Sequence, residues 1–220
     1  MDIASVMRYV VDIAVAYLLG GISWALIIGK VFYKVDVREH GSGNLGATNV
    51  FRTLGIKAAI ATLLLDAAKG AAAVGIAYAV FSASGEVAQQ WAMILATMAA
   101  ILGHSYSPYI RFAGGKGVAT AAGALLVLTP HPWPILLLSF MLVVVLFRMV
   151  SLASVIIAIE YPLLCVFFYP GDWLIIGFSV VTASLVVWRH RSNIARIVRG
   201  EESKVSFRGR GSAIRGKDAS

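Results

Sequence analysis

The sequence contains few charged side chains. Asp, Glu, Lys and Arg make up 14% of its 220 residues, whereas they make up about a quarter of an average soluble domain. Apolar residues account for 59% of the chain, and the mean hydropathy is +0.82. This composition excludes a water-soluble globular protein and indicates a small protein that crosses a membrane several times. The single cysteine, Cys165, also excludes an intrachain disulfide framework and a multi-cysteine metal site.

The apolar runs predict an all-α integral membrane protein with about seven transmembrane helices. The predicted spans are approximately Tyr9–Ile28, Ile56–Phe81, Val87–Leu102, Val118–Thr129, Trp133–Phe147, Leu152–Tyr169 and Trp173–Trp188. The fourth and fifth runs, 118–129 and 133–147, are short for a hydrocarbon core of about 30 Å. They either extend into their flanks or form a re-entrant hairpin together. A break is expected at Arg148–Ser151, because a single helix across it would be about 55 Å long.

Lys and Arg lie in alternate loops. They occur in the first, third and fifth loops and from Arg189 onward, while loops 82–86, 130–132 and 170–172 contain none. Because basic residues stay on the cytoplasmic side, the N-terminus is predicted outside and the C-terminus in the cytoplasm. The net charge of +8 therefore points to a membrane surface and not to nucleic acid. We expect a transmembrane domain over residues 1–198 and a basic, flexible cytoplasmic tail over residues 199–220.

The first cytoplasmic segment, residues 41–52, reads Gly-Ser-Gly-Asn-Leu-Gly-Ala-Thr-Asn-Val-Phe-Arg. Glycines let backbone N–H groups approach an oxyanion closely, and the planar fork of an arginine matches a phosphate group. The density of hydrogen-bonding side chains favours a phosphate-binding loop over an ordinary turn with a positive-inside arginine. The candidate side chains are Ser42, Asn44, Thr48, Asn49 and Arg52.

A second glycine-rich turn lies within residues 103–120, where Gly-Gly-Lys-Gly at 114–117 precedes the predicted span at Val118. Such a turn at a helix N-terminus offers free amides and the positive end of the helix dipole to a phosphate, with a lysine as point charge. It lacks the spacing and the Gly-Lys-Ser/Thr ending of a P-loop, so it does not indicate ATP. The candidate residues here are His104, Gly114, Gly115, Lys116, Gly117 and Thr120.

The third segment, residues 189–202, follows the last predicted span. His190, Asn193 and Arg196 are spaced by three and would share one face of a helix. Taken alone, this segment is explained more simply as a basic stop signal.

Charged residues also lie inside predicted spans. Asp66 and Lys69 are three apart in the second span, where an ion pair that holds helices together and a role in a substrate cavity are both compatible with the sequence. Glu160 has no evident partner in the sequence. His40 and His131 show no ligand spacing, so no metal site is expected.

The three segments together resemble the signature regions of the bacterial acyl-phosphate:glycerol-3-phosphate acyltransferases, the PlsY family. The resemblance rests on the motif at 41–52, on Gly-Gly-Lys-Gly at 114–117, and on His-x-x-Asn at 190–193 with Gly200 and Glu202 beyond it. It extends to Asp66-x-x-Lys69-Gly70 and to the motif spacing, and it covers the chain up to about residue 204. The motifs show no departure from the family pattern.

The resemblance implies a seven-helix enzyme of the bacterial inner membrane with its active site facing the cytoplasm and no cofactor. It would transfer a fatty acyl group from acyl phosphate to the 1-hydroxyl of glycerol 3-phosphate, giving lysophosphatidic acid and phosphate in the first step of phospholipid synthesis. It would be coupled functionally to the soluble enzyme that makes acyl phosphate.

The resemblance also implies residue roles by motif position. Ser42, Arg52 and Lys116 would contact a substrate, and the glycines at 114, 115 and 117 would line a phosphate site. His190 and Asn193 would complete the pocket. Glu202 would hold the third segment in place, and Asp66 and Lys69 would give structural support.

The residues are consistent with such chemistry, because an acyl phosphate is already an activated mixed anhydride and needs no protein nucleophile. Cys165 lies in an apolar span, where a thiol is inert, and no Ser-His-Asp order or Gly-x-Ser-x-Gly elbow is present. We expect direct transfer in a ternary complex, with cationic groups stabilising the developing charge. A substrate phosphate oxygen or His190 would accept the proton.

A small transporter of phosphorylated or anionic solutes is the alternative. Several spans, intramembrane charges and glycine-rich helix starts also suit a transporter. Against it, the polar segments gather on one face of the membrane, and no inverted repeat is visible.

Overall fold

A computed structural model describes residues 2–205, which form helices joined by turns and loops. No β-strand occurs in this part of the chain, so the all-α prediction is confirmed for it. The described residues form two compact units, one up to Leu128 and one from Thr129 onward.

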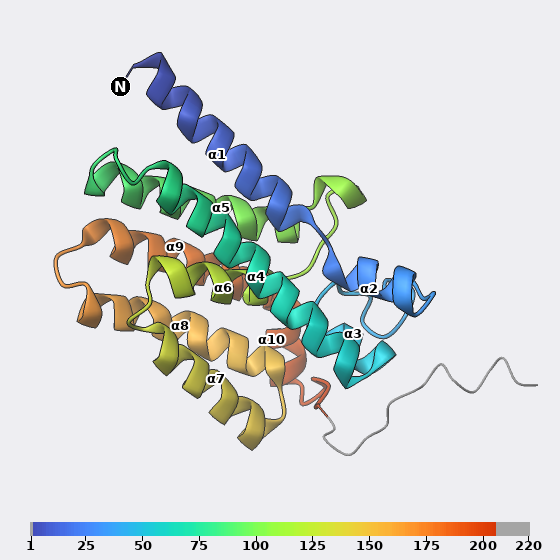
Figure 1. The fold of residues 1–220 in the computed structure, drawn as a ribbon. Coiled ribbons are helices and arrows are strands. Elements are labelled where there is room, and N and C mark those ends of the chain that lie inside the picture. The colour runs from blue at the N-terminus through green and yellow to red at the C-terminus, as the bar shows by residue number, and fades with distance from the viewer. Residues whose placement is uncertain (1, 206–220) are drawn as a thin grey trace, which may run out of the picture. The chain divides into compact units, whose positions relative to one another are not determined.

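The first unit contains the N-terminal helices, coloured blue to green in Figure 1. They are α1 (Ile3–Gly21), α2 (Trp24–Phe32), α3 (Ala47–Leu54), α4 (Ile56–Val80), α5 (Glu86–Ser105), the short 3-10 helix η1 (Pro108–Ile110) and α6 (Val118–Leu128). The second unit contains α7 (Trp133–Phe147), α8 (Val150–Phe168), α9 (Trp173–Arg189) and α10 (Arg191–Val198).

The prediction of one continuous span over Tyr9–Ile28 is wrong, because the helix breaks after Gly21 and a separate helix begins at Trp24. A helix end leaves carbonyl groups without intrahelical partners. Two side chains from distant parts of the unit bind these carbonyls. The hydroxyl of Ser107 donates to the Gly21 carbonyl and the ammonium group of Lys69 donates to the Ile22 carbonyl, both at 2.6 Å.

Glycines bring the helices of the first unit into close contact. A Cβ on Gly20 of α1 would collide with the Ala100 carbonyl of α5, and a Cβ on Gly103 of α5 would collide with the Tyr17 carbonyl of α1. The pair α4 and α6 is packed in the same reciprocal way. Gly70 lies against the Thr120 carbonyl and Gly123 against the Ala67 carbonyl. Small residues allow helices in a membrane to pack this closely, and here they bring Asp66 and Lys69 on α4 near the end of α5.

Part of the first motif is helical, which the sequence analysis did not predict. α3 covers its second half, and it packs with α2 and the start of α4 around an apolar cluster. The cluster anchors the intervening loop, since two of its residues belong to that loop. The buried members are Ala25, Leu26, Ile28, Val37, Leu45, Val50, Ala58 and Ala59.

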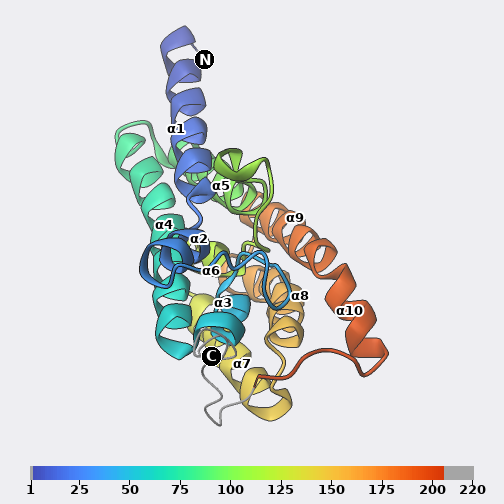
Figure 2. The ribbon, with the colours of Figure 1, turned by 90° about the vertical axis from the view of Figure 1, so that its right-hand side faces the viewer.

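In the second unit, the predicted break near Arg148–Ser151 is confirmed. α7 ends at Phe147, Arg148 adopts a left-handed conformation with φ 61°, and α8 begins at Val150. Figure 2 shows α9 leading into α10, and their axes differ by 60°. Glu160, which had no evident partner in the sequence, accepts a hydrogen bond from Ser139 of α7 at 3.0 Å.

Among the described helices, α1, α4 and α8 are long and apolar enough to cross a membrane. A fourth span results if the bent pair α9 and α10 counts as one. α6 and α7 are apolar but shorter, with 11 and 15 residues. The structure therefore supports an integral membrane protein, while seven spans and the orientation of the termini stay predictions.

Candidate functional site

Asn49 determines the shape of the first motif loop. Its amide nitrogen donates to the carbonyls of Val37 and His40 at 2.9 and 3.2 Å. Its amide oxygen accepts from the backbone N–H and the hydroxyl of Ser42 at 2.8 and 3.2 Å. Gly41, at φ 61°, passes so close that a Cβ there would collide with this oxygen. Asn49 is buried, and its four hydrogen-bonding positions are used within the loop, so in this structure it positions Ser42.

The other residues of this motif lie nearer the surface. Ser42 is exposed, whereas Asn44, Thr48 and Arg52 are half-buried. α3 carries Thr48 in its first turn and Arg52 in its last turn.

Two cations upstream of the motif are paired with one acid. Asp36 binds Arg38 at 2.6 Å and Lys30 at 3.0 Å. The hydrogen bonds from Arg38 hold the pKa of Asp36 well below its usual range. Part of the positive charge of this loop, that of Lys30 and Arg38, is therefore used in ion pairs that stabilise the loop.

The second motif turn packs directly on His104 at the end of α5. The N–H of Gly115 donates to the His104 carbonyl at 3.1 Å. A Cβ on Gly114 would collide with that carbonyl, and a Cβ on Gly115 would collide with Nε2 of His104. Gly117, at φ 79°, leads into α6. The glycines are thus required by the contact with His104, and the turn opens a helix as predicted, with Lys116 half-buried beside it.

Two buried hydroxyl groups lie at this turn. Ser105 Oγ is 3.4 Å from the position that a Cβ on Gly117 would occupy, and Thr120 lies in the first turn of α6. Neither hydroxyl has a hydrogen-bond partner within the described part of the chain. Buried polar groups are normally hydrogen-bonded, so both hydroxyls are available to a ligand at the helix N-terminus. Thr120 was a predicted site residue, whereas Ser105 was missed.

Asp66, Lys69 and His104 form one buried cluster. Lys69 Nζ lies 2.8 Å from Asp66 Oδ1 and 3.0 Å from His104 Nδ1. From the sequence, Asp66 and Lys69 could form a structural ion pair or line a cavity. They form an ion pair within α4, and His104 connects this pair to the glycine turn.

In the second unit, His190 lies at the bend between α9 and α10, so it does not continue the helical face that was predicted to carry Asn193 and Arg196. Its Nδ1 lies 2.8 Å from the Val186 carbonyl. Because a carbonyl can only accept, Nδ1 carries a proton, and in the neutral imidazole Nε2 then carries the lone pair.

Glu202 organises the third motif. Its Oε1 accepts from Asn193 Nδ2 and from Ser151 Oγ, both at 2.7 Å, and its Oε2 accepts from Arg196 Nε at 2.8 Å. Burial by itself raises the pKa of Glu202, but these three hydrogen bonds outweigh it and lower the pKa below its ordinary value. Glu202 thus holds Asn193 in place as a carboxylate.

The start of the predicted flexible tail is also held by the second unit. The N–H of Val205 donates to the Arg148 carbonyl at 2.7 Å, and Arg148 Nε donates to the Val205 carbonyl at 2.9 Å. The remainder of the predicted tail lies outside the described residues.

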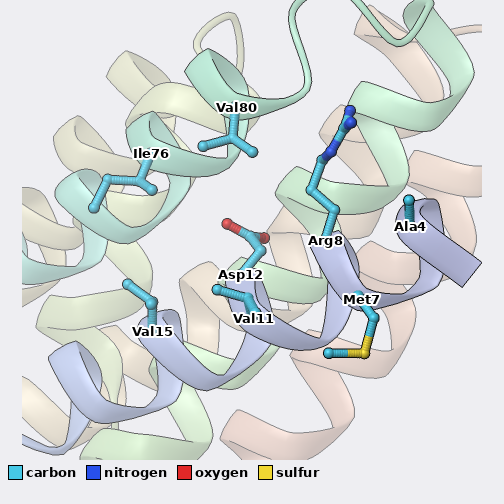
Figure 3. Close-up of a pocket in the computed structure, with 8 residues that line it drawn as sticks. All are labelled: Ala4, Met7, Arg8, Val11, Asp12, Val15, Ile76 and Val80. Carbon is cyan, nitrogen blue, oxygen red and sulfur yellow. The ribbon is translucent and has the colours of Figure 1, made fainter.

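Asp12, which was not among the predicted site residues, lies in the middle of α1. Its carboxyl group lies in a groove of about 490 Å³ lined by residues of α1 and α4. Figure 3 shows Ile76 and Val80 of α4 opposite Asp12. Asp12 is 5% exposed, and neither carboxyl oxygen has a hydrogen-bond partner among the described residues. A scan for ionisable residues within apolar runs would have found it.

The described residues contain no group of three or more His, Cys, Asp or Glu side chains that could hold a metal ion. The polar chemistry of the first unit is instead that of an anion site, with a glycine turn, a helix N-terminus, buried hydroxyls and Lys116.

Comparison with known proteins decides which enzyme family uses this arrangement. The sequence model of the family described as glycerol-3-phosphate acyltransferase matches residues 10–200. The chain belongs to the glycerol-3-phosphate acyltransferase family. A glycerol-3-phosphate acyltransferase of Bacillus cytotoxicus is 43% identical over 193 residues, which cover 88% of this chain and 93% of that protein. The corresponding protein of Listeria monocytogenes is 42% identical over 192 residues, covering 87% and 94%.

Solved structures show the same fold. The crystal structure of PlsY (YgiH), an integral membrane glycerol 3-phosphate acyltransferase, in its glycerol 3-phosphate form matches with a TM-score of 0.81 and 35% identity. The match covers 90% of this chain and 96% of that one. The lysophosphatidic acid form of PlsY matches with a TM-score of 0.79 and 34% identity.

The predicted PlsY-family membership is therefore confirmed. The chain is an integral membrane acyltransferase of lipid biosynthesis, and family membership favours this enzyme class over the transporter considered from sequence.

Proposed function

We propose that this acyltransferase uses acyl phosphate as its donor and transfers the fatty acyl group directly to the sn-1 hydroxyl of glycerol 3-phosphate. The glycerol oxygen attacks the acyl carbonyl carbon, an ester bond forms, and the bond from the acyl carbon to the phosphate oxygen breaks. The hydroxyl proton passes to Nε2 of His190, and lysophosphatidic acid and inorganic phosphate are released. No acyl-enzyme forms, because the mixed anhydride is already activated.

The observation that carries this proposal is the glycine turn at the N-terminus of α6. Its close packing on His104 aligns the turn at the start of the helix, beside Lys116 and next to the unpartnered hydroxyls of Ser105 and Thr120. Helix N-termini with adjacent cations bind phosphate groups. Both proposed substrates carry a phosphate, whereas the body of the protein is apolar enough for a fatty chain.

Roles in the first unit follow from chemistry and placement. The proposed substrate contacts are made by Ser42, Arg52 and Lys116, with Arg52 as the bidentate partner of a phosphate. Asn44 and Thr48 belong to the same motif and are half-buried, and they add hydrogen bonds to the phosphate group. Asn49 acts through Ser42, since its own amide is used by the loop.

Roles in the second unit follow from the contacts of His190 and Glu202. With its proton on Nδ1, His190 offers the lone pair of Nε2 as a general base for the glycerol hydroxyl. Asn193 is a substrate contact whose orientation is set by Glu202.

We also propose the arrangement in the membrane that the charge pattern predicts. Seven spans cross the bacterial inner membrane, the N-terminus is outside, and the three motifs face the cytoplasm, where a soluble enzyme supplies acyl phosphate. Single cysteines at Glu39 and Ala83, introduced into a Cys165→Ala background, test the orientation in intact cells. A membrane-impermeant maleimide should label the Ala83 variant only, and labelling of Glu39→Cys would invert the arrangement.

The donor is tested with purified protein in detergent. Palmitoyl phosphate or palmitoyl-CoA is mixed with glycerol 3-phosphate, and phosphate release and lysophosphatidic acid are followed by mass spectrometry. Equal amounts of both products from palmitoyl phosphate alone are expected. Product from palmitoyl-CoA alone would overturn the donor assignment, and a labelled acyl group covalently attached to the protein would overturn direct transfer.

A further inference from the structure

Lys69 uses its hydrogen-bonding capacity inside the first unit. Its Nζ lies 2.6 Å from the Ile22 carbonyl, 2.8 Å from Asp66 Oδ1 and 3.0 Å from His104 Nδ1. An ammonium group has three hydrogens to donate and no acceptor. Lys69 is therefore hydrogen-bonded to Ile22 and His104 and ion-paired with Asp66, so its ammonium group is directed at groups of this unit.

The contact with Lys69 determines which nitrogen of His104 carries the proton. Since the ammonium group can only donate, Nδ1 of His104 accepts, and the ring proton of the imidazole lies on Nε2. The opposite tautomer would need an acceptor for Nδ1–H. The nearest carboxylate oxygen, Asp66 Oδ1, lies 3.7 Å from Nδ1, which is beyond hydrogen-bond distance.

The protonated nitrogen of His104 lies at the glycine turn. Nε2 is so close to Gly115 that a Cβ on this residue would collide with it. The carbonyl of the same histidine binds the N–H of Gly115, so His104 contacts the turn through both its backbone and its ring. Ser105, the next residue of α5, adds its unpartnered hydroxyl near Gly117.

We propose that Lys69 sets the tautomer of His104, and that Nε2–H of His104 donates a hydrogen bond to a phosphate group bound at the Gly114–Gly117 turn. This inference rests on the proposed function, because it concerns the phosphate of glycerol 3-phosphate or of acyl phosphate. His104 is then a binding residue that adds a donor without adding a fixed charge. Lys69 and Asp66 are positioning residues that act through it.

Two amide substitutions separate the two nitrogens of His104. Asn places its amide near the position of Nδ1, so His104→Asn keeps an acceptor for Lys69 but loses the donor at the turn. Gln reaches the position of Nε2, so His104→Gln keeps the donor but leaves Lys69 without its third partner. We expect His104→Asn to retain stability and to raise one phosphate-substrate KM about tenfold to a hundredfold. His104→Gln should melt at a lower temperature yet keep that KM within about threefold.

The kinetic measurement also identifies the phosphate. Initial rates are recorded with glycerol 3-phosphate varied at saturating palmitoyl phosphate, and then with the two substrates exchanged. A rise of the KM for glycerol 3-phosphate alone assigns the turn to the acceptor, and a rise for palmitoyl phosphate alone assigns it to the donor. A purely structural role of His104 would instead lower stability and activity together in both variants.

The tautomer is tested independently of activity by ¹⁵N NMR of the histidine-labelled protein. The chain has 4 histidines, and loss of one resonance pair in His104→Asn assigns the signal. We expect a bare Nδ1 and a protonated Nε2 in the parent. The double variant Asp66→Leu/Lys69→Met removes both buried charges together, which avoids an unpaired ion, and the His104 signals should shift toward a mixture of tautomers.

The outcomes distinguish this inference from the proposed function. If the parent transfers no acyl group from palmitoyl phosphate, the proposed function fails while the NMR result still decides the tautomer. If the parent is active and His104→Asn keeps both KM values within about twofold, the hydrogen bond to phosphate is overturned. A protonated Nδ1 in the parent would overturn the role of Lys69.

Discussion

Asn193 Nδ2 donates to Glu202 Oε1 at 2.7 Å, which couples a predicted substrate contact to a residue beyond the last helix. Ser151 binds the same carboxylate oxygen from the start of α8. The carboxylate of Glu202 thus ties α8, α10 and the segment after α10 together. The orientation of Asn193 therefore depends on a charged acceptor, so removing that charge should change both stability and its dependence on pH.

Replacing Glu202 by Gln should lower the stability of the second unit. The hydrogen bond from Arg196 loses its charge assistance, and the new amide group of Gln places its own hydrogens against groups that also donate. We expect a loss of about 1–3 kcal/mol in the free energy of unfolding. Thermal unfolding in detergent measures the effect. Glu201→Gln is the matched control, because Glu201 pairs with Arg199 at the surface with both side chains 57% exposed, and exposed ion pairs contribute little. Equal effects of the two substitutions would contradict the role assigned to Glu202.

The same carboxylate predicts a dependence of stability on pH. The pKa of Glu202 in the folded protein is below its ordinary value of 4.5, so folding favours the charged form. The stabilisation is therefore complete above about pH 4.5 and is lost as the pH falls through the folded pKa. The difference in melting temperature between the parent and Glu202→Gln should be constant near about pH 7 and shrink in acid. A difference that grows on acidification would show the opposite linkage.

Gly115→Ala should greatly reduce acyl transfer. The added methyl group collides with Nε2 of His104, so either the turn or the imidazole must move away from the phosphate site. Gly75→Ala in α4 is the control, since a Cβ there meets open space beside its own helix and alanine favours a helix by about 0.5–1 kcal/mol over glycine. Rates and melting temperatures of both variants check this. Normal turnover of Gly115→Ala would show that the turn tolerates displacement.

Asp12→Leu should raise the melting temperature and leave acyl transfer unchanged. Asp12 buries a carboxyl group that has no hydrogen-bond partner in the described residues, and such a group costs about 1–3 kcal/mol. Asp12→Asn keeps the shape and the polarity, so it should gain less. A lower melting temperature for Asp12→Leu would mean that lipid or water in the groove between α1 and α4 binds the carboxyl group.

Arg52→Lys should lose most of the activity, because a point charge cannot replace the bidentate guanidinium fork. Arg8→Lys, at an exposed position of α1, is the matched control and should retain full activity. Activity above about half of the parent value in Arg52→Lys would remove the phosphate-clamp role.

Cys165→Ala should leave turnover nearly unchanged, because Cys165 is fully buried in α8 and direct transfer uses no thiol. The rate with palmitoyl phosphate checks this. A large loss of turnover at an unchanged melting temperature would reopen an acyl-enzyme route.

Most helix bounds could be predicted from hydropathy, because apolar runs, glycines and prolines act locally. The runs at 56–81 and 133–147 correspond closely to α4 and α7. The span over Tyr9–Ile28 could not be predicted correctly, since its break depends on Lys69 and Ser107, which bind the freed carbonyls from 47 and 86 residues away. The helix α3 was not predicted, because its residues belong to a motif that is rich in glycine and polar side chains and has no apolar run.

The sequence by itself determined the membrane character, the all-α class and the family, because composition and ordered motifs are properties of the chain alone. It also identified Ser42, Arg52, Lys116, His190 and Asn193 as candidates for the chemistry. Only the tertiary structure decided that Lys69 binds His104, that Asn49 positions Ser42, and that Glu202 accepts a hydrogen bond from Asn193. These relationships depend on hydrogen bonds whose atoms meet at 2.7–3.0 Å, and such distances arise only when the chain is folded.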